Sequence, residues 1–235
     1  MPTVLVTGAN RGLGLEFVRQ YAGEGWRVLA CARKASTADR LTQVAATARG
    51  RVTIHSLDVS EFGQIDALGK SLPGEPIDVL LNNAGIYGDR AGARKIEFGT
   101  LDYDVWARSF RINAMAPIRM GEVVLPNLER SAQKKVGNGT SRMGSIGDNE
   151  SGASYVYRSS KAALNMATRS LAIDLAPRGI LAVVVNPGWV QTDMGGKEAP
   201  MGVEESVRGV RNVVDGLTPE RSGSFLEYDG EEIPW

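Results

Sequence analysis

Short runs of β-branched and aliphatic residues alternate with longer amphipathic stretches along almost the whole chain. After the first apolar run, Leu13, Phe17 and Tyr21 recur at helical spacing, and that stretch stops at a glycine. Such alternation is typical of a parallel sheet wound with helices on both faces. The expected strands are residues 3–7, 26–32, 51–57, 77–82, a segment that begins at 134, 180–186 and 222–228. The expected helices are residues 13–25, 36–48, 61–72, 101–130, 153–177 and 206–217.

Two long helical regions complete the expected architecture. Pro117 is expected to kink the region 101–130, because proline removes a backbone donor. Residues 180–186 are uninterruptedly apolar, as expected for a strand covered on both faces. The sequence contains no linker, repeat or low-complexity segment, so we expect residues 1–235 to form one domain. The expected fold class is α/β, a single-domain Rossmann fold with a doubly wound parallel sheet of about seven strands. The two long helices also offer a surface for a homodimer.

The composition excludes several classes of protein. Lys and Arg number 27 and Asp and Glu 27, whereas a nucleic-acid binder would show a basic excess. The only cysteine, Cys31, and the only histidine, His55, leave no cysteine-rich or histidine-rich metal site, so no metal is expected. A Ser-His-Asp triad would depend on His55 alone, and a structural role is the better interpretation of this residue. With no signal-peptide pattern and no membrane-length apolar run, we expect a cytoplasmic protein without a membrane partner.

The turn after the first expected strand is rich in glycine. It reads TGANRGLG, with Gly8, Gly12 and Gly14 between the strand and the first helix. Glycines there let the backbone turn sharply and let a pyrophosphate approach the N–H groups at a helix N-terminus. Glycine-bearing turns without a nucleotide are common. What favours dinucleotide binding is the position of this turn, directly between the first strand and the first helix.

Cations follow the second expected strand. Dinucleotide-binding folds usually carry an acidic residue there, which binds the ribose 2′-hydroxyl. This strand instead ends with Arg33 and Lys34, and Arg11 lies in the glycine-rich turn. Cations at these positions suit a 2′-phosphate, so NADP(H) is predicted in preference to NAD(H).

Tyr157 and Lys161 are spaced to share one face of a helix. An ammonium group beside a phenol stabilises the phenolate, and such a tyrosine can exchange a proton with a carbonyl or an alcohol near neutral pH. The spacing alone is a weak signal, since two exposed helical residues would produce it. Tyr155, two residues earlier, would face away from Lys161, so we expect it to have a structural role and no part in proton transfer.

Taken together, five motifs resemble the short-chain dehydrogenase/reductase superfamily. They are TGANRGLG (7–14), NNAG (82–85), Asn113 within RINAMAP, YRSSK (157–161) and NPGWVQTDM (186–194), in the order of that family. The tail LTPERSGSFLEYDGEEIPW is similar to the C-factor-like and sniffer-like carbonyl reductase branch.

The resemblance implies a role for each matching residue. The implied catalytic residues are Asn113, Ser141, Tyr157 and Lys161. The implied cofactor-binding residues are Gly8, Asn10, Arg11, Gly12, Leu13, Gly14, Arg33, Asp58, Val59, Asn83, Ala84, Gly85, Tyr157, Lys161, Pro187, Gly188, Val190 and Thr192. Within this set Asn113 would hold a water molecule of a proton relay that reaches Lys161, and Asn83 could equally be only a turn stabiliser.

The strand that precedes the expected catalytic serine departs from the family pattern. Gly137 and Gly139 stand where large apolar side chains are expected, which suggests a bulge or a loosened strand. Ser141 matches the S-x-x-G pattern of the family, and Ser145 is the alternative.

The implied activity is hydride transfer between NADP(H) and a small-molecule carbonyl or alcohol. The alternative is a dinucleotide-binding regulatory or signalling protein of the same fold with little turnover. A short substrate lid is expected near residues 192–202. An apolar substrate pocket would be lined by Tyr87, Met143, Ile146 and Trp189, although Trp189 could equally pack the loop.

Overall fold

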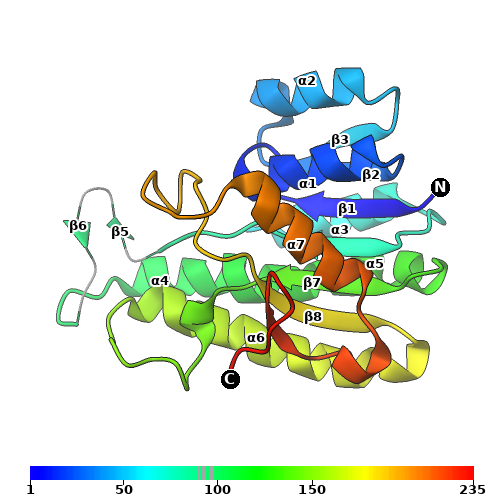
Figure 1. The fold of residues 1–235 in the computed structure, drawn as a ribbon. Helices are drawn as coiled ribbons and strands as arrows, with labels where there is room; N and C mark the ends of the chain where they lie inside the picture. The colour runs from blue at the N-terminus through cyan, green and yellow to red at the C-terminus, as the bar shows by residue number, and fades with distance from the viewer. Residues whose placement is uncertain (89, 92–93, 96–97) are drawn as a thin grey trace.

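The described part of the chain, residues 1–88, 90–91, 94–95 and 98–235 of a computed structural model, folds around a seven-stranded sheet (Figure 1). The strands are β1 Thr3–Thr7, β2 Arg27–Ala32, β3 Val52–Ser56, β4 Val79–Asn82, β7 Lys135–Gly139, β8 Leu181–Asn186 and β9 Phe225–Glu227. Their spatial order is β3-β2-β1-β4-β7-β8-β9, and each neighbouring pair is parallel. The predicted single-domain α/β fold is confirmed. Arg90–Ala91 and Arg94–Lys95 add a short antiparallel pair, β5 and β6, that the sequence analysis did not predict.

Helices cover both faces of the sheet. The α-helices are α1 Gly12–Gly23, α2 Asp39–Thr47, α3 Phe62–Ser71, α4 Tyr103–Phe110, α5 Ala116–Glu129, α6 Tyr155–Leu175 and α7 Val203–Asp215. One core cluster joins α1, α2 and α7 to the sheet, and a second joins α3, α5 and α6 to its other face. Short 3₁₀ segments lie at Ala35–Thr37, Arg142–Gly144, Ala176–Arg178 and Pro219–Arg221. In the described residues, no helix combines the length and the apolar character needed to cross a membrane.

The predicted kink at Pro117 is wrong in its position. The irregularity is a π-helical segment, Arg111–Met115, that separates α4 from α5. Pro117 itself lies in the first turn of α5, where a missing N–H group is tolerated. Asn113 lies within this wider turn, and π-helical turns are frequent at functional sites.

The two glycines of β7 do not form a bulge. Gly137 pairs in register with Leu81 of β4 and Val183 of β8, and the strand is regular on both sides. A methyl group at Gly137 would lie 2.9 Å from both Leu81 Cδ2 and Val214 Cγ2. These side chains occupy the space that a larger residue would need, so the glycine serves close packing rather than loosening the strand.

Candidate active site

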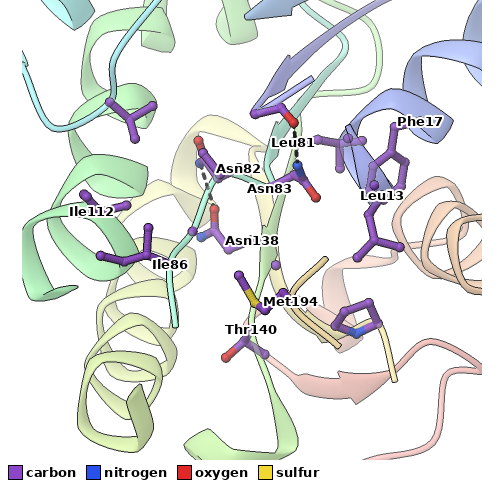
Figure 2. A pocket seen from close by; sticks show the side chains of 18 of the residues that line it. Leu13, Phe17, Leu81, Asn82, Asn83, Ile86, Ile112, Asn138, Thr140 and Met194 are labelled. Carbon is purple, nitrogen blue, oxygen red and sulfur yellow. Dashed lines mark hydrogen bonds between the residues drawn. The ribbon is translucent and has the colours of Figure 1, made fainter. Parts of the chain in front are cut away.

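A cavity of about 530 Å³ opens at the carboxyl ends of the parallel strands (Figure 2). Ligands bind at this edge in folds of this type. Figure 2 shows Leu13 and Phe17 of α1 on one side and Ile86 and Ile112 on the other. Sixteen of the predicted site residues line it, namely Gly8, Asn10, Arg11, Gly12, Leu13, Gly14, Arg33, Asp58, Val59, Asn83, Ala84, Gly85, Tyr157, Lys161, Pro187 and Thr192.

The residues that line the cavity and the predicted site residues are not the same set. The wall formed by the described residues does not include Asn113, Ser141, Gly188 or Val190. It does include residues that the sequence analysis did not select, among them Phe17, Leu57, Leu81, Ile86, Ile112, Asn138, Thr140, Val185, Asp193, Met194, Val210 and Val214. Asp193 and Met194 could have been found, because both belong to the NPGWVQTDM motif. The apolar residues could not have been found from the sequence, because only the folded sheet shows which of them reach the cavity.

The glycine-rich turn is closed tightly against the end of β4. Gly8 has a φ of +68°, a left-handed conformation that favours glycine. A methyl group at Gly14 would lie only 2.1 Å from the carbonyl oxygen of Gly8. Asn83 Nδ2 donates to the carbonyl oxygens of Thr7 at 2.9 Å and Gly8 at 3.3 Å, so its side chain stabilises the turn. The start of α1 is thereby left accessible to an anion.

Two arginines belong to the cavity wall, one in the glycine-rich turn and one just after β2. Arg11 and Arg33 both line it, whereas Lys34 is outside the wall that the described residues form. Arg11 Nη1 forms an ion pair with Asp193 Oδ2 at 2.6 Å, between two exposed side chains. Burial raises the pKa of Asp58, but hydrogen bonds from Ser60 and the nearby guanidinium of Arg33 outweigh it and hold this pKa below its usual value. Near the ends of β2 and β3 the cavity wall therefore combines the cation of Arg33 with the carboxylate of Asp58.

Tyr157 and Lys161 lie together where α6 meets the cavity. Lys161 Nζ donates to the carbonyl oxygen of Gly139 at 2.7 Å and lies 5.7 Å from the ring centroid of Tyr157. The ring of Tyr87 stands 4.8 Å from that of Tyr157. Burial lowers the pKa of Lys161 to about 8, because the ammonium group loses solvation. Tyr155 is 39 % exposed and faces Phe98 instead, as predicted for the structural tyrosine.

The depressed pKa of Lys161 predicts a distinctive pH dependence of stability. Between pH 8 and 10.5 the unfolded chain binds more protons at this residue than the folded protein does. The free energy of unfolding of the wild type should therefore rise by up to about 3 kcal/mol relative to Lys161→Met across that range. Urea unfolding of both proteins, without ligand, at several pH values measures the difference. Parallel pH profiles for the two proteins would contradict it.

Asn113 contributes its side chain to the scaffold rather than to the cavity. Its Nδ2 donates to the carbonyl oxygen of Ile86 and to Ser160 Oγ, both at 2.9 Å, and its Oδ1 accepts from the Ile86 amide at 2.9 Å. These bonds tie the π-helical turn to the loop after β4 and to the start of α6. Asn113 thus fixes the turn of helix that presents Tyr157.

The two candidate serines have different surroundings. Ser141 is partly exposed, and its Oγ accepts from the Met143 amide at 3.2 Å. Ser145 is only 2 % exposed, and its Oγ donates to the carbonyl oxygen of Pro234 at 2.6 Å. Since the hydroxyl proton of Ser145 is engaged by the C-terminal tail, the geometry favours Ser141 as the hydroxyl that can donate to a ligand.

His55 and metal binding can be assigned from the same geometry. His55 lies in β3, at the edge of the sheet, and burial lowers its pKa, which favours the neutral ring. Within the described ranges, no three His, Cys, Asp or Glu side chains are grouped as a metal site requires. His55 is not among the described residues that line the cavity.

Comparison with known proteins identifies the family. The family model described as short chain dehydrogenase matches residues 2–201. The chain belongs to the short-chain dehydrogenase/reductase family. It is 50 % identical over 160 residues to the C-signal protein of Myxococcus xanthus, a match that covers 68 % of this chain and 93 % of that protein. The family and the C-factor-like branch predicted from the motifs are therefore confirmed.

Two solved structures of carbonyl reductases show the same fold. The carbonyl reductase Sniffer of D. melanogaster superimposes with a TM-score of 0.91 at 32 % identity, with 100 % of each chain covered. An NADPH-bound carbonyl reductase from chicken fatty liver superimposes with a TM-score of 0.88 at 33 % identity, with 100 % of this chain and 99 % of that chain covered. An oxidoreductase is thus supported, and the alternative of a regulatory protein without turnover is not favoured.

Proposed function

We propose that this protein is an NADP(H)-dependent carbonyl reductase. The observation that carries the proposal is the pair of Tyr157 and Lys161 at the wall of a cavity that also contains the glycine-rich turn. The NADPH-bound chicken reductase supports the same cofactor and substrate class. The reaction joins NADPH, a small carbonyl compound and a proton to give NADP⁺ and an alcohol, or runs in reverse.

The residues of the cavity fit a phosphorylated dinucleotide. Gly14 lies so close to Gly8 that only glycine leaves the turn open for a pyrophosphate at the N-terminus of α1. Arg11 and Arg33 would hold the 2′-phosphate, because guanidinium groups match phosphate oxygens. Asp58, with Val59, would contact the adenine. When bound, NADPH supplies the hydride.

The protein's own side chains would handle the proton and the developing charge. Tyr157 would give its phenolic proton to the carbonyl oxygen, acting as a general acid. Lys161 would favour that transfer while it is charged, since an ammonium group stabilises the phenolate that remains. Ser141 would donate a hydrogen bond to the same oxygen, where negative charge develops.

The surroundings of the cavity mouth favour an apolar carbonyl compound. Ile146 is 78 % exposed and Trp189 is 59 % exposed, on the loops that follow β7 and β8. Trp189 Nε1 donates to the carbonyl oxygen of Gly195 at 2.7 Å, so the indole is fixed against the lid segment while its ring faces solvent. The proposed lid, near residues 192–202, begins three residues after this tryptophan. The expectation that Tyr87, Met143, Ile146 and Trp189 line the cavity is wrong, because none of them belongs to the wall that the described residues form. These side chains would contact only a part of the substrate that extends beyond that wall.

NADPH oxidation with a panel of ketones, aldehydes and quinones tests the proposal. Turnover with apolar members of the panel supports it, and the Tyr157→Phe variant shows whether the proposed proton donor is responsible. Cofactor binding without turnover of any compound would contradict it.

Arg33→Ala should weaken NADPH binding while leaving NADH binding unchanged. A charge-assisted bond to phosphate is worth about 1.5–3 kcal/mol, so the dissociation constant for NADPH should rise about tenfold or more. Fluorescence titration with both cofactors measures the ratio, and Lys34→Ala, next in the chain but outside the described cavity wall, is the matched control. An unchanged NADPH-to-NADH affinity ratio in Arg33→Ala would refute the assignment of the 2′-phosphate site.

The proposal also includes a homodimer in the cytoplasm. Met166 and Ile173 are 67 % and 61 % exposed and stand seven residues apart on α6, so they form one apolar stripe on a long helix. The single cysteine, Cys31, is buried and free, as suits a reducing compartment. Light scattering after size-exclusion chromatography tests the dimer.

A further inference from the structure

Glu227, the last residue of β9, joins the loop after β7 to the end of β8. Its side chain is only 12 % exposed. Oε1 accepts from Arg142 Nε at 2.8 Å, and Oε2 accepts from Asn186 Nδ2 at 2.6 Å. Each carboxylate oxygen therefore binds a different segment of the chain.

The two partners of Glu227 are neighbours of proposed site residues. Arg142 directly follows Ser141, and Asn186 directly precedes Pro187. Asn186 is also the register partner of Glu227 in the parallel pair β8–β9. Through one carboxylate, the sheet thus fixes the loop of the proposed serine relative to the loop that begins with Pro187.

The loop after β7 is held by the C-terminal tail at further points. Within the loop itself, Arg142 Nη1 forms an ion pair with Asp148 Oδ2 at 3.3 Å. The Gly147 amide donates to the carbonyl oxygen of Trp235 at 2.8 Å, in addition to the bond from Ser145 to Pro234. Because β7 has glycine at 137 and 139, it has no side chains at these positions to anchor its carboxyl end. Asn138 and Thr140 anchor this end through Thr168 and Asn165, and the tail adds anchorage from outside the strand.

We infer that Glu227 is a positioning residue that sets the hydroxyl of Ser141 relative to the cofactor side of the cavity. The inference rests on the proposed role of Ser141 and goes beyond it by naming what holds that residue. Misplacing a reacting group by about 1 Å can cost on the order of a hundredfold in rate. Arg142 is 54 % exposed, and exposed ion pairs add little to stability, so positioning explains the bridge better than stabilisation does.

Glu227→Gln is the test variant, because glutamine keeps the length and shape of glutamate but presents an N–H group to one of the two donors. We expect kcat for NADPH-dependent carbonyl reduction, normalised to the number of NADPH-binding sites, to fall about tenfold. The KM for NADPH should stay within about threefold, because Glu227 is outside the cavity wall that the described residues form. The isotope effect with C4-deuterated NADPH should rise as hydride transfer becomes rate-limiting. Glu232→Gln, an exposed glutamate of the same tail, is the control and should match the wild type.

A second measurement needs no turnover. Backbone amides of residues 142–147 should exchange with deuterium faster in Glu227→Gln than in the wild type or in Glu232→Gln. A kcat within twofold of the wild type, or unchanged exchange in this segment, overturns the inference. If the wild type itself fails to reduce any carbonyl, the proposed function fails, and the exchange experiment still decides whether Glu227 holds the loop.

Discussion

Tyr157→Phe is expected to lower kcat for carbonyl reduction by about 10²- to 10⁴-fold, the usual contribution of a general acid. The substitution removes only the phenolic oxygen. Tyr157 is 8 % exposed and its ring packs against Tyr87, so phenylalanine should keep the packing and the fold. The affinity for NADPH, measured by fluorescence titration, should remain within a few-fold of the wild type. Loss of rate with retained cofactor binding is what distinguishes a proton donor from a structural tyrosine.

Tyr155→Phe provides the matched control for this prediction. Tyr155 lies two residues earlier on α6, is 39 % exposed and contacts Phe98. The same chemical change there should leave kcat within about twofold, because surface substitutions away from the site have small effects. If Tyr157→Phe retained a tenth or more of the wild-type kcat, another group would have to be the proton donor.

The rate of carbonyl reduction should fall as pH rises above about 8, because Lys161 favours the proton transfer only while it is charged. Its pKa of about 8 leaves most of this residue charged at neutral pH and neutral above that value.

The bond from Lys161 Nζ to the carbonyl oxygen of Gly139 connects the lysine to the end of β7, one residue before Thr140. Gly139 is therefore part of the site through its backbone, which explains why the absence of a side chain there does not weaken the arrangement.

The architecture could be predicted from the sequence because strand and helix periodicities are local. The runs at 3–7 and 180–186 correspond to β1 and β8, and the helical pattern at 206–217 falls on α7. Details that depend on packing could not be predicted. The glycines of β7 suggested a bulge, but Leu81 and Val214 fill the space beside Gly137 and keep the strand regular.

The site was predictable where a motif contains the chemistry and less so where distant contacts decide. The glycine-rich turn, Tyr157 and Lys161 all line the cavity, as their motifs indicated. The water molecule expected at Asn113 stays a prediction, and the bonds of its side chain to Ile86 and Ser160 from within the π-helical turn were not predicted. Such partners are separated by many residues in the chain, so no local pattern reveals them.

Gly14→Ala should disrupt both the fold and cofactor binding. The new methyl group would lie 2.1 Å from the Gly8 carbonyl oxygen and 2.6 Å from Asn83 Nδ2, and the first of these atoms belongs to the backbone of a tightly closed turn. Alanine gains helix propensity, but overpacking of this kind costs about 1–3 kcal/mol or more, so we expect a net loss of stability of roughly 2 kcal/mol. Moving the turn also displaces the N–H groups of α1, and NADPH affinity should fall at least about a hundredfold because the pyrophosphate loses its oriented donors.

Gly23→Ala, at the other end of the same helix, separates this clash from the general effect of adding a methyl group. Outside the adjoining backbone of the helix, a methyl group there would meet no described atom within 4 Å, and the residue is exposed. It should keep wild-type NADPH affinity and change stability by no more than about 1 kcal/mol, in the stabilising direction, because alanine restricts the unfolded chain. Urea unfolding and fluorescence titration of both variants make the comparison. Wild-type affinity in Gly14→Ala would mean that the cofactor does not depend on this turn, and the assignment of the cavity to a dinucleotide would have to be abandoned.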